Sequence, residues 1–294
     1  MMRILILGGG GTLGHKLWQT LPSKFPDTFV SIRKTKDFYA KCGLFTGANV
    51  IDNLDLRDFA GLNRVLDEIK PSVIVNCAGI TPRREDAHND VNIITINSLL
   101  PHKLAAWCAA NHARLIHFST DCVFNGEKGN YNELSLSDAN DLYGRTKALG
   151  EVISPYAFVL RTSMIGREIF GGTELLEWFL AQRGKKIKGY RKAVFSGLTT
   201  NQHAAVVGDV IGKSPALNGC YNVASQAVSK YDLLLMLREA YNLDVEIEPD
   251  DSVDCRRNLD GSKFVNATGF VCPSWRQMLA EMAADKTPYS AWRK

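Results

Sequence analysis

The N-terminal segment constrains the fold more than any other part of the chain. The apolar run Arg3-Ile4-Leu5-Ile6-Leu7 leads directly into Gly8-Gly9-Gly10-Gly11-Thr12-Leu13-Gly14, and residues 15–21 can open a helix. The glycines satisfy both GxxGxxG and GxGxxG, and the strand before them and the helix after them favour a phosphate-binding turn over a flexible loop. A dinucleotide pyrophosphate would bind at the helix N-terminus, where free N–H groups favour anions. The turn residues expected to bind this cofactor are Gly8, Gly11, Thr12, Leu13 and Gly14.

Apolar runs and helical segments alternate through the first 165 residues. The expected strands after the first are 28–33, 49–54, 72–77, 114–118 and 157–161, and the expected helices are 58–69, 93–111 and 141–154. Such alternation predicts the α/β class, with a doubly wound parallel sheet (Rossmann fold) and ligands at the carboxyl ends of its strands.

The alternation of strands and helices becomes less regular after about residue 165. Expected there are a helix at 173–182, a basic stretch at 185–192, a helix that starts at Ser229 with a capping-box pattern, a short strand at 245–247 and a last helix at 275–284. We predict that residues 1–165, with a return segment at about 193–222, form an NAD(P)-binding Rossmann domain. Residues 166–192 and 223–294 are then a smaller, interleaved C-terminal substrate lobe.

Composition excludes several classes of protein. Of the 294 residues 45% are hydrophobic, and the formal net charge of +4 is spread along the chain, so no nucleic-acid partner is expected. No run reaches the ~18 apolar residues of a membrane span, and no signal peptide is recognisable. Seven cysteines without a CxxC pair and six histidines without HExxH predict reduced thiols in the cytoplasm and no metal site.

Tyr143 and Lys147 lie four residues apart on an expected helix and therefore share one face, whereas Arg145 points to another. A free tyrosine titrates near pH ~10, so the nearby ammonium would stabilise its phenolate. The pair predicts a proton donor for carbonyl reduction.

The choice of cofactor depends on the end of the second strand. A carboxylate about 20 residues past the glycines would bind the ribose 2′-hydroxyl of NAD, but the chain has Arg33-Lys34 there. Two cations suit a 2′-phosphate, so we predict NADPH; NADH is possible if these cations are only a solvated strand end.

Four further segments, in order along the chain, resemble motifs of the extended short-chain dehydrogenase/reductases, and among them of the dTDP-4-dehydrorhamnose reductase family. The family's STDYVFxG is similar to STDCVFNG at 119–126, and its YGxTK to YGRTK at 143–147. Its RTS matches 161–163 and its NLD-type element matches 258–260. With the glycine turn, the resemblance covers nearly the whole chain.

The resemblance implies roles for individual residues. Tyr143 would protonate the sugar carbonyl, Lys147 would hold the cofactor ribose and lower the Tyr143 pKa, and Thr120 would bind the same carbonyl oxygen. The alternatives for Thr120 are that it only caps the next turn or that Ser119 shares its work. The remaining cofactor contacts implied are Asp55 and Leu56 at the adenine, and Ala78, Gly79 and Ile80 at the nicotinamide-side ribose.

The absence of one acidic residue after Asp121 narrows the choice of reaction. Related nucleotide-sugar 4,6-dehydratases have Thr-Asp-Glu where this chain has Thr120-Asp121-Cys122, and a thiol replaces a carboxylate poorly. The resemblance therefore implies an NADPH-dependent reductase of a nucleotide-linked 4-keto-6-deoxysugar, in dTDP-rhamnose or other polysaccharide biosynthesis. A nucleotide-sugar epimerase and a non-catalytic NADP-binding regulatory subunit remain open.

The nucleotide and the sugar also remain open. The family typically has tryptophan after RTS and Val-Asp after the fourth strand, whereas this chain has Met164 and Thr81-Pro82-Arg83-Arg84. Asp121 and Met164 are expected at the sugar. Lys188, Arg191 and Arg256 are candidates for the substrate diphosphate, or else solvated surface charges. The resemblance also allows a homodimer.

Overall fold

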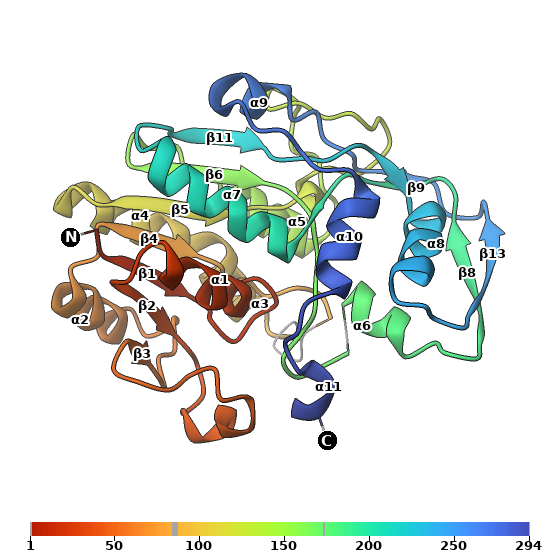
Figure 1. Cartoon of the computed structure of the whole chain (residues 1–294). Helices are drawn as coiled ribbons and strands as arrows, with labels where there is room; N and C mark the ends of the chain where they lie inside the picture. Colours follow the sequence, from red (N-terminus) through yellow and green to blue (C-terminus); the bar gives the residue numbers. More distant parts are fainter. Residues whose placement is uncertain (1, 84–87, 173, 294) are drawn as a thin grey trace.

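A parallel sheet of seven strands forms the centre of the computed structural model, which describes residues 2–83, 88–172 and 174–293 (Figure 1). Its order is β11-β6-β5-β4-β1-β2-β3, so the chain reverses direction of winding between β1 and β4. This confirms the doubly wound α/β class. The strands are β1 (Ile4–Leu7), β2 (Thr28–Ser31), β3 (Val50–Ile51), β4 (Val73–Asn76), β5 (Arg114–Phe118), β6 (Ala157–Arg161) and β11 (Gly219–Asn222).

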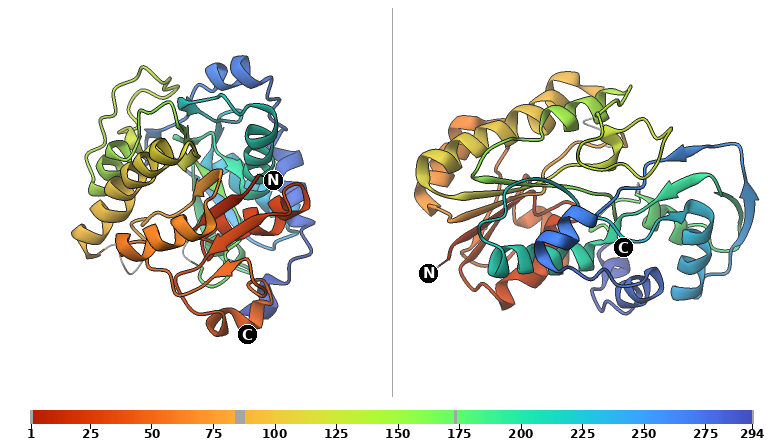
Figure 2. Two further views of the ribbon diagram at one scale, coloured as in Figure 1. Left: turned by 90° about the vertical axis from the view of Figure 1, so that its left-hand side faces the viewer. Right: turned by 90° about the horizontal axis from the view of Figure 1, so that it is seen from above.

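The sheet is buried on both faces. Alternate residues of β1 enter different cores: Ile4 and Ile6 pack with Leu17 on one side, and Leu5 and Leu7 with Leu62 on the other. Figure 2 shows helices on each face of the sheet. The first core includes α1 (Gly14–Thr20) and α7 (Thr200–Lys213), and the second includes α2 (Phe59–Ile69) and α4 (Leu100–Asn111).

The expected helix at 93–111 is in fact three pieces: α3 (Asp90–Ile94), the π-helical η4 (Thr95–Leu99) and α4. The Asn97 side chain accepts from Ile80 N at 2.9 Å and donates to Ile80 O at 3.0 Å. The bulge thus ties the helix to the loop after β4. The helix expected at 141–154 is shorter too: α5 (Leu142–Leu149) ends where Gly150 packs on the Asn97 backbone.

The C-terminal part contains small sheets and helices beside the large sheet. The expected helices at 229 and 275 are present, and Asp232 N donates to the capping Ser229 Oγ at 2.9 Å. The elements before α7 are β7 (Met164–Ile165), α6 (Leu175–Leu180), β8 (Lys186–Tyr190), β9 (Ala193–Phe195) and β10 (Leu198–Thr199). Those after β11 are β12 (Val228–Ser229), α8 (Lys230–Ala240), β13 (Glu246–Asp250), β14 (Cys255–Arg256), α9 (Ser262–Thr268), α10 (Trp275–Ala283) and α11 (Tyr289–Trp292).

Several elements were not predicted from the sequence. The basic stretch at 185–192 contains β8, which pairs in parallel with β13. Its lysines pair with acids of β13, so the pattern lacks the apolar alternation of a half-buried strand. Within the expected return segment, α7 and β11 rejoin the large sheet, whereas β9 pairs with β12 and β14.

Residues 285–293, here termed the C-terminal strap, fasten the last residues of the lobe to α1. Tyr289 Oη lies 2.8 Å from His15 Nε2, and Lys16 forms an ion pair with Asp285. His15 Nδ1 donates to Gly11 O at 2.8 Å, so Nε2 is the acceptor and the tyrosine hydroxyl donates. Burial lowers the pKa of His15 to about 4, so this pairing stays the same at neutral pH.

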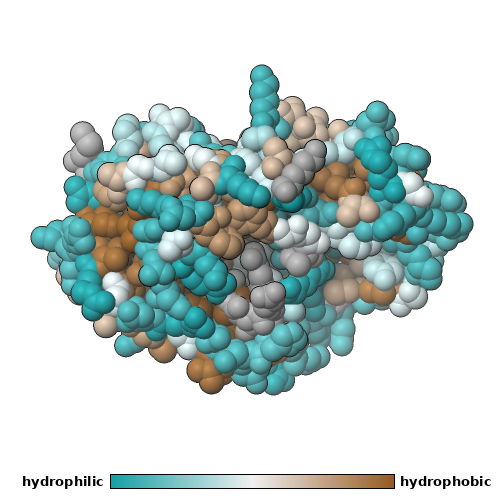
Figure 3. Space-filling view, turned by 90° about the horizontal axis from the view of Figure 1, so that it is seen from below, coloured by the Kyte–Doolittle hydropathy of each residue, from teal (hydrophilic) through white to brown (hydrophobic). Residues whose placement is uncertain are grey.

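Hydrophilic side chains cover most of the face seen from below, where hydrophobic side chains form separate patches (Figure 3). All seven cysteines are free thiols. Across residues 2–83, 88–172 and 174–293, no helix has the length and apolar character needed to cross a membrane.

Candidate functional site

The glycine turn follows β1 at the carboxyl edge of the sheet. Gly8 has a φ of +85°, which disfavours any residue with a Cβ, and a Cβ at Gly14 would collide with the carbonyl oxygen of Gly8. Gly9 N donates to Ser31 O at 2.8 Å and Gly11 N to Gly8 O at 3.0 Å. The turn is therefore tightly closed against β2 and the first residues of α1.

A cavity opens beside this turn and contains most of the predicted cofactor residues. The four predicted cofactor residues that are not on the cavity wall are Thr12, Leu13, Gly14 and Lys34. Leu13 is buried in the core, and Lys34 Nζ lies 5.9 Å from the ring centroid of Phe38. The predicted residues that line the cavity are Gly8, Gly11, Arg33, Asp55, Leu56, Ala78, Gly79 and Ile80. Those that sequence analysis missed are Gly10, Ser31, Tyr39, Leu54, Arg57, Cys77 and Ile96.

The polar rim of the cavity combines two arginines with one carboxylate. Arg57 Nε donates to Asp55 Oδ1 at 2.9 Å, and this hydrogen bond is the largest influence that lowers the Asp55 pKa; Arg33 also lowers it. Arg33 lines the same wall. The rim can therefore bind a phosphate through guanidinium groups while Asp55 stays ionised.

Tyr39 closes another side of the cavity. Its hydroxyl lies against Gly10, where any Cβ would collide with it. Its ring stacks on Phe170, with centroids 5.6 Å apart, and Phe170 follows β7. A residue after β2 and a residue of the later lobe thus meet beside the glycine turn.

Helix α5 contains Tyr143 and Lys147, neither of which is on the cavity wall. Gly144 N donates to the capping Asp141 Oδ1 at 2.7 Å, which fixes the helix start. Lys147 Nζ donates to Phe118 O at 2.5 Å, and burial lowers the Lys147 pKa to about 8. Cys77 lines the cavity and lies near enough to influence that pKa, so Lys147 adjoins the cavity wall.

The expected lowering of the Tyr143 pKa is not found in this structure. Burial raises the pKa of Tyr143, as do the Cys122 and Asp121 charges, and a hydrogen bond with Thr120 opposes them. The Lys147 ammonium is directed to the Phe118 carbonyl instead. Tyr143 is therefore a neutral phenol near pH 7, the form that donates a proton.

Thr120 caps the next turn, as one of the two alternatives expected. Its Oγ1 accepts from Cys122 N at 3.1 Å at the start of the short η5 (Asp121–Val123) and donates to Asp121 Oδ1 at 3.2 Å, and the hydroxyl also lowers the Tyr143 pKa. Ser119 Oγ instead donates to Glu151 at 2.6 Å. Ser119 is thus engaged elsewhere, and Thr120 is the hydroxyl beside Tyr143.

Asp121 faces cations from the C-terminal lobe that the sequence analysis did not identify. Burial raises its pKa, while a bond with Ser163 and the charges of Lys230 and Arg257 oppose this rise. Arg257 Nη1 donates to Cys122 Sγ at 3.4 Å, and its buried Nε has no hydrogen-bond partner among the described residues. Lys230 and Arg257 therefore lie beside the Thr120 segment. Their sequence signals were weak: a helix start and a basic pair before NLD.

Thr81 and Arg83 border the same region. Both reach Glu174, at 3.5 Å each, and Glu174 is one of the charges that influence the Tyr143 pKa. Arg84 lies outside the described residues. Met164 begins β7 and packs partly buried against the core.

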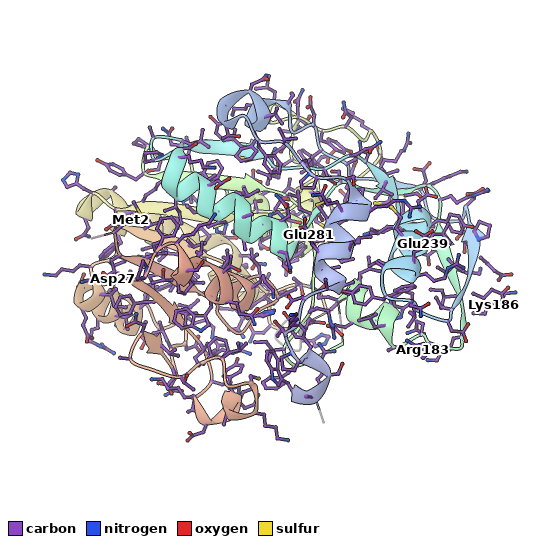
Figure 4. The ribbon with its side chains drawn as sticks, viewed as in Figure 1. Met2, Asp27, Arg183, Lys186, Glu239 and Glu281 are labelled. Atoms are coloured by element: carbon purple, nitrogen blue, oxygen red, sulfur yellow. The ribbon has the colours of Figure 1, made fainter. Side chains whose placement is uncertain are left out.

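The three predicted diphosphate ligands lie at the surface, each with an acidic partner. Lys188 pairs with Asp250 at 3.2 Å, Arg191 with Asp251, and Arg256 with Asp254 at 2.9 Å. Their side chains are 69%, 54% and 48% exposed. The edge formed by β8 and β13 is marked by Lys186 on the right of Figure 4, far from Asp27 at the start of β2.

Comparison with known proteins identifies relatives among nucleotide-sugar enzymes. The chain is 36% identical over 100 residues to a dTDP-4-keto-6-deoxy-D-glucose reductase of Streptomyces niveus, which covers 34% of this chain and 35% of that protein. It is 29% identical over 168 residues to a dTDP-4-dehydrorhamnose reductase of Aggregatibacter actinomycetemcomitans, over 55% of this chain and 51% of that protein. The chain thus spans about a third to a half of the length of these two relatives.

Another relative has a different description. Methionine adenosyltransferase 2 subunit beta of Xenopus tropicalis is 25% identical over 259 residues, which cover 82% of this chain and 72% of that protein. This similarity extends over more of the chain at lower identity.

A solved structure confirms the fold. The dTDP-4-dehydrorhamnose reductase from Bacillus anthracis in complex with NADP has a TM-score of 0.77 at 21% identity, and the match covers 96% of this chain and 98% of that one. The family model described as RmlD substrate binding domain matches residues 2–287. These matches confirm the resemblance inferred from the motifs, and the chain belongs to the RmlD substrate binding domain family.

Proposed function

We propose that the protein is an NADPH-dependent reductase of a nucleotide-linked 4-keto-6-deoxysugar. One observation carries this proposal: the Thr120 hydroxyl lies beside Tyr143, whose pKa it lowers, and Lys147 on the same helix lies near Cys77 of the cavity wall. A hydroxyl and a neutral phenol at one point can both bind a carbonyl oxygen.

The cavity fits a dinucleotide with a 2′-phosphate. The closed glycine turn provides backbone N–H groups for the pyrophosphate, and Arg33 and Arg57 lie on the wall near the expected adenine end, with Asp55 and Leu56. NADPH would supply the hydride when bound. Thr12, Leu13 and Gly14 would shape the turn, Lys34 would add charge nearby, and Ala78, Gly79 and Ile80 would pass the ribose.

In the reaction, the carbon of the C4 carbonyl gains a hydride and becomes the carbon of an alcohol. The Tyr143 hydroxyl donates its proton to the carbonyl oxygen as the π bond breaks, and the Thr120 hydroxyl holds that oxygen in place. Solvent then returns the proton to Tyr143, and Lys147, whose ammonium donates to the Phe118 carbonyl in this structure, would hold the cofactor ribose. Tyr143, Thr120 and Lys147 are therefore the proposed catalytic residues.

Charged groups of the lobe would select the substrate. Asp121 and Met164 lie at the end of β5 and at the start of β7, where the sugar would bind, and Lys230 and Arg257 face Asp121. An acceptor on the bound sugar or its diphosphate would satisfy the unpartnered Nε of Arg257. For this role we favour Lys230 and Arg257 over the surface residues Lys188, Arg191 and Arg256.

The test is oxidation of NADPH, followed by the loss of its near-ultraviolet absorbance. The substrates are dTDP-4-keto-6-deoxysugars, with and without a sugar epimerase, and UDP-linked 4-keto-6-deoxy-N-acetyl sugars. We expect turnover with one of them. If none is reduced although NADPH binds, the reductase proposal is wrong.

The similarity to methionine adenosyltransferase 2 subunit beta favours a second candidate, a non-catalytic subunit of another enzyme. The presence of Thr120, Tyr143 and Lys147 at one site argues for catalysis instead. A wild-type protein that binds NADPH, reduces no keto-sugar and copurifies with a partner would support the second candidate.

We further propose that residues 1–165 and about 193–222 form the NAD(P)-binding domain, and that residues 166–192 and 223–294 form the substrate lobe. The proposed location is the cytoplasm, where the free thiols would stay reduced.

Two copies would pair through α3 and the end of α5, where Val91, Ile94, Leu149 and Ile153 are 71%, 47%, 67% and 98% exposed. Light scattering of the wild type and of Leu149→Lys tests the pairing, which predicts a dimer and a monomer respectively.

A further inference from the structure

Glu151, four residues after Lys147, forms an ion pair away from the solvent. Arg161 Nε donates to Glu151 Oε1 at 2.9 Å, and Arg161 Nη2 to Oε2 at 2.5 Å. The two side chains are only 5% and 11% exposed, for Arg161 and Glu151 respectively. A two-point pairing of this kind fixes the carboxylate in one orientation.

The same carboxylate is bonded to the end of β5. Ser119 Oγ donates to Glu151 Oε1 at 2.6 Å, while the preceding residue, Phe118, accepts from Lys147 through its carbonyl. Ser119 N in turn donates to Leu160 O at 2.8 Å, on β6. The residues just before Thr120 are thus fastened to α5 through Lys147 and to the segment after α5 through Glu151.

The charges around Lys147 also indicate a role for Glu151. The titratable groups that face Lys147 are Glu151, the Cys77 thiol after β4 and His117 on β5. Burial raises the pKa of Cys77 and lowers that of His117, so both are neutral at pH 7. Glu151 is the carboxylate of this group, and its other neighbours are Arg161 and the neutral thiol of Cys220.

We propose that Glu151 is a positioning residue for the reaction: its carboxylate, held by Arg161, bonds to Ser119 and so keeps Thr120, and the Phe118 carbonyl that accepts from Lys147, in register with α5. This proposal goes one step beyond the proposed function, because it assigns the site a carboxylate that contacts neither the cavity wall nor Tyr143.

The experiment compares NADPH binding of the wild type and Glu151→Gln between pH 6 and pH 10 by cofactor fluorescence, together with kcat and KM. In the wild type, binding should weaken as pH rises through about 8, where Lys147 loses its proton. Removing the carboxylate lowers the Lys147 pKa, so the weakening should occur about one pH unit earlier. The kcat above pH 7 should fall by about tenfold, with little change in KM for the sugar.

Two controls isolate the effect. Glu239 on α8 forms a surface ion pair with Arg276 on α10, and Glu239→Gln should leave the pH midpoint of NADPH binding unchanged (Figure 4). Lys147→Met should remove the pH dependence, which assigns it to Lys147. Since Glu151→Gln leaves Arg161 buried without its partner, the double variant Glu151→Gln/Arg161→Met removes the Glu151 charge together with that of Arg161 and leaves no unpaired buried charge.

The outcomes separate this proposal from the proposed function. Failure to reduce any keto-sugar would contradict the reductase, but the binding titration would still test Glu151. The proposal is overturned if the pH midpoint of NADPH binding in the single variant, or in the folded double variant, equals that of the wild type. The ion pair would then be merely structural.

Discussion

The proposed cofactor side and the proposed substrate side of the site are built in different ways. The cofactor cavity is lined by short segments that each follow a strand of one sheet, such as Gly8, Arg33 and Ala78. The substrate side joins the end of β5 to Lys230 and Arg257, more than 100 residues further along the chain. The first is a property of the sheet edge, whereas the second exists only when the lobe packs against it.

The two sides also differ in electrostatics. Arg57 and Asp55 on the cofactor rim are each 39% exposed, so solvent and salt screen their charges. On the substrate side, burial lowers the pKa of Lys230 and raises that of Asp121. Charge changes should therefore act more strongly on the substrate side.

The largest expected effect lies where the two sides meet. Tyr143→Phe removes the proton donor but preserves ring packing, so kcat should fall by about 10²–10⁴-fold. NADPH affinity, measured by fluorescence, should change little because the cavity wall is intact. Near-normal turnover in this variant would rule out Tyr143 as the acid.

A pair of lysine variants tests whether the substrate side depends on buried cations. Lys230→Met should lower kcat/KM for the nucleotide sugar by about ten- to hundredfold, because a charged contact away from solvent is lost. Lys188→Met, at the exposed β8 edge, should change it by about twofold or less. Steady-state kinetics that gave the reverse order would return the diphosphate site to the outer edge.

On the cofactor side, the effect should be smaller and selective. Arg33→Ala should weaken NADPH binding by about tenfold while NADH binding changes little, since only NADPH has a 2′-phosphate. Equal losses for the two cofactors, measured by fluorescence titration, would contradict the NADPH assignment.

The smallest effect concerns the contact between the two parts. Tyr289→Phe removes the bond to His15, so the free energy of unfolding should fall by about 1 kcal/mol. Urea unfolding measures it, with the exposed Tyr190→Phe as the matched control. No difference between these variants would mean that the strap is held by its other contacts.

Sequence reasoning found residues that the fold brings together where their position depends on neighbours in the chain. The glycine turn, the strand ends at Arg33 and Ala78, and the Tyr143–Lys147 spacing each combine local geometry with residue type, and the structure brings most of them to one cavity. The strands were found because burial on both faces leaves continuous apolar runs.

It failed where partners come from distant elements. Lys188 and Arg191 are surface-type cations in sequence, as Lys230 is, yet the first two pair with acids at the end of β13 and just after it, and Asp121 faces the third. Tyr39 meets Gly10 from the short 3-10 helix Asp37–Cys42, which no periodicity in the sequence predicts. The direction of the Tyr143 pKa shift likewise depends on burial, which the YxxxK pattern does not report.

The C-terminal strap sets the order in which the molecule can be completed during translation. His15 and Tyr289 are separated by 274 residues, so the ribosome makes the partner of α1 long after α1 itself. A nascent chain that already contains all of β1 to β6 still lacks the cover for His15 and Lys16, which are 0% and 7% exposed in the finished protein. The contacts of α1 with the strap therefore form late, after the strands of the large sheet have been made.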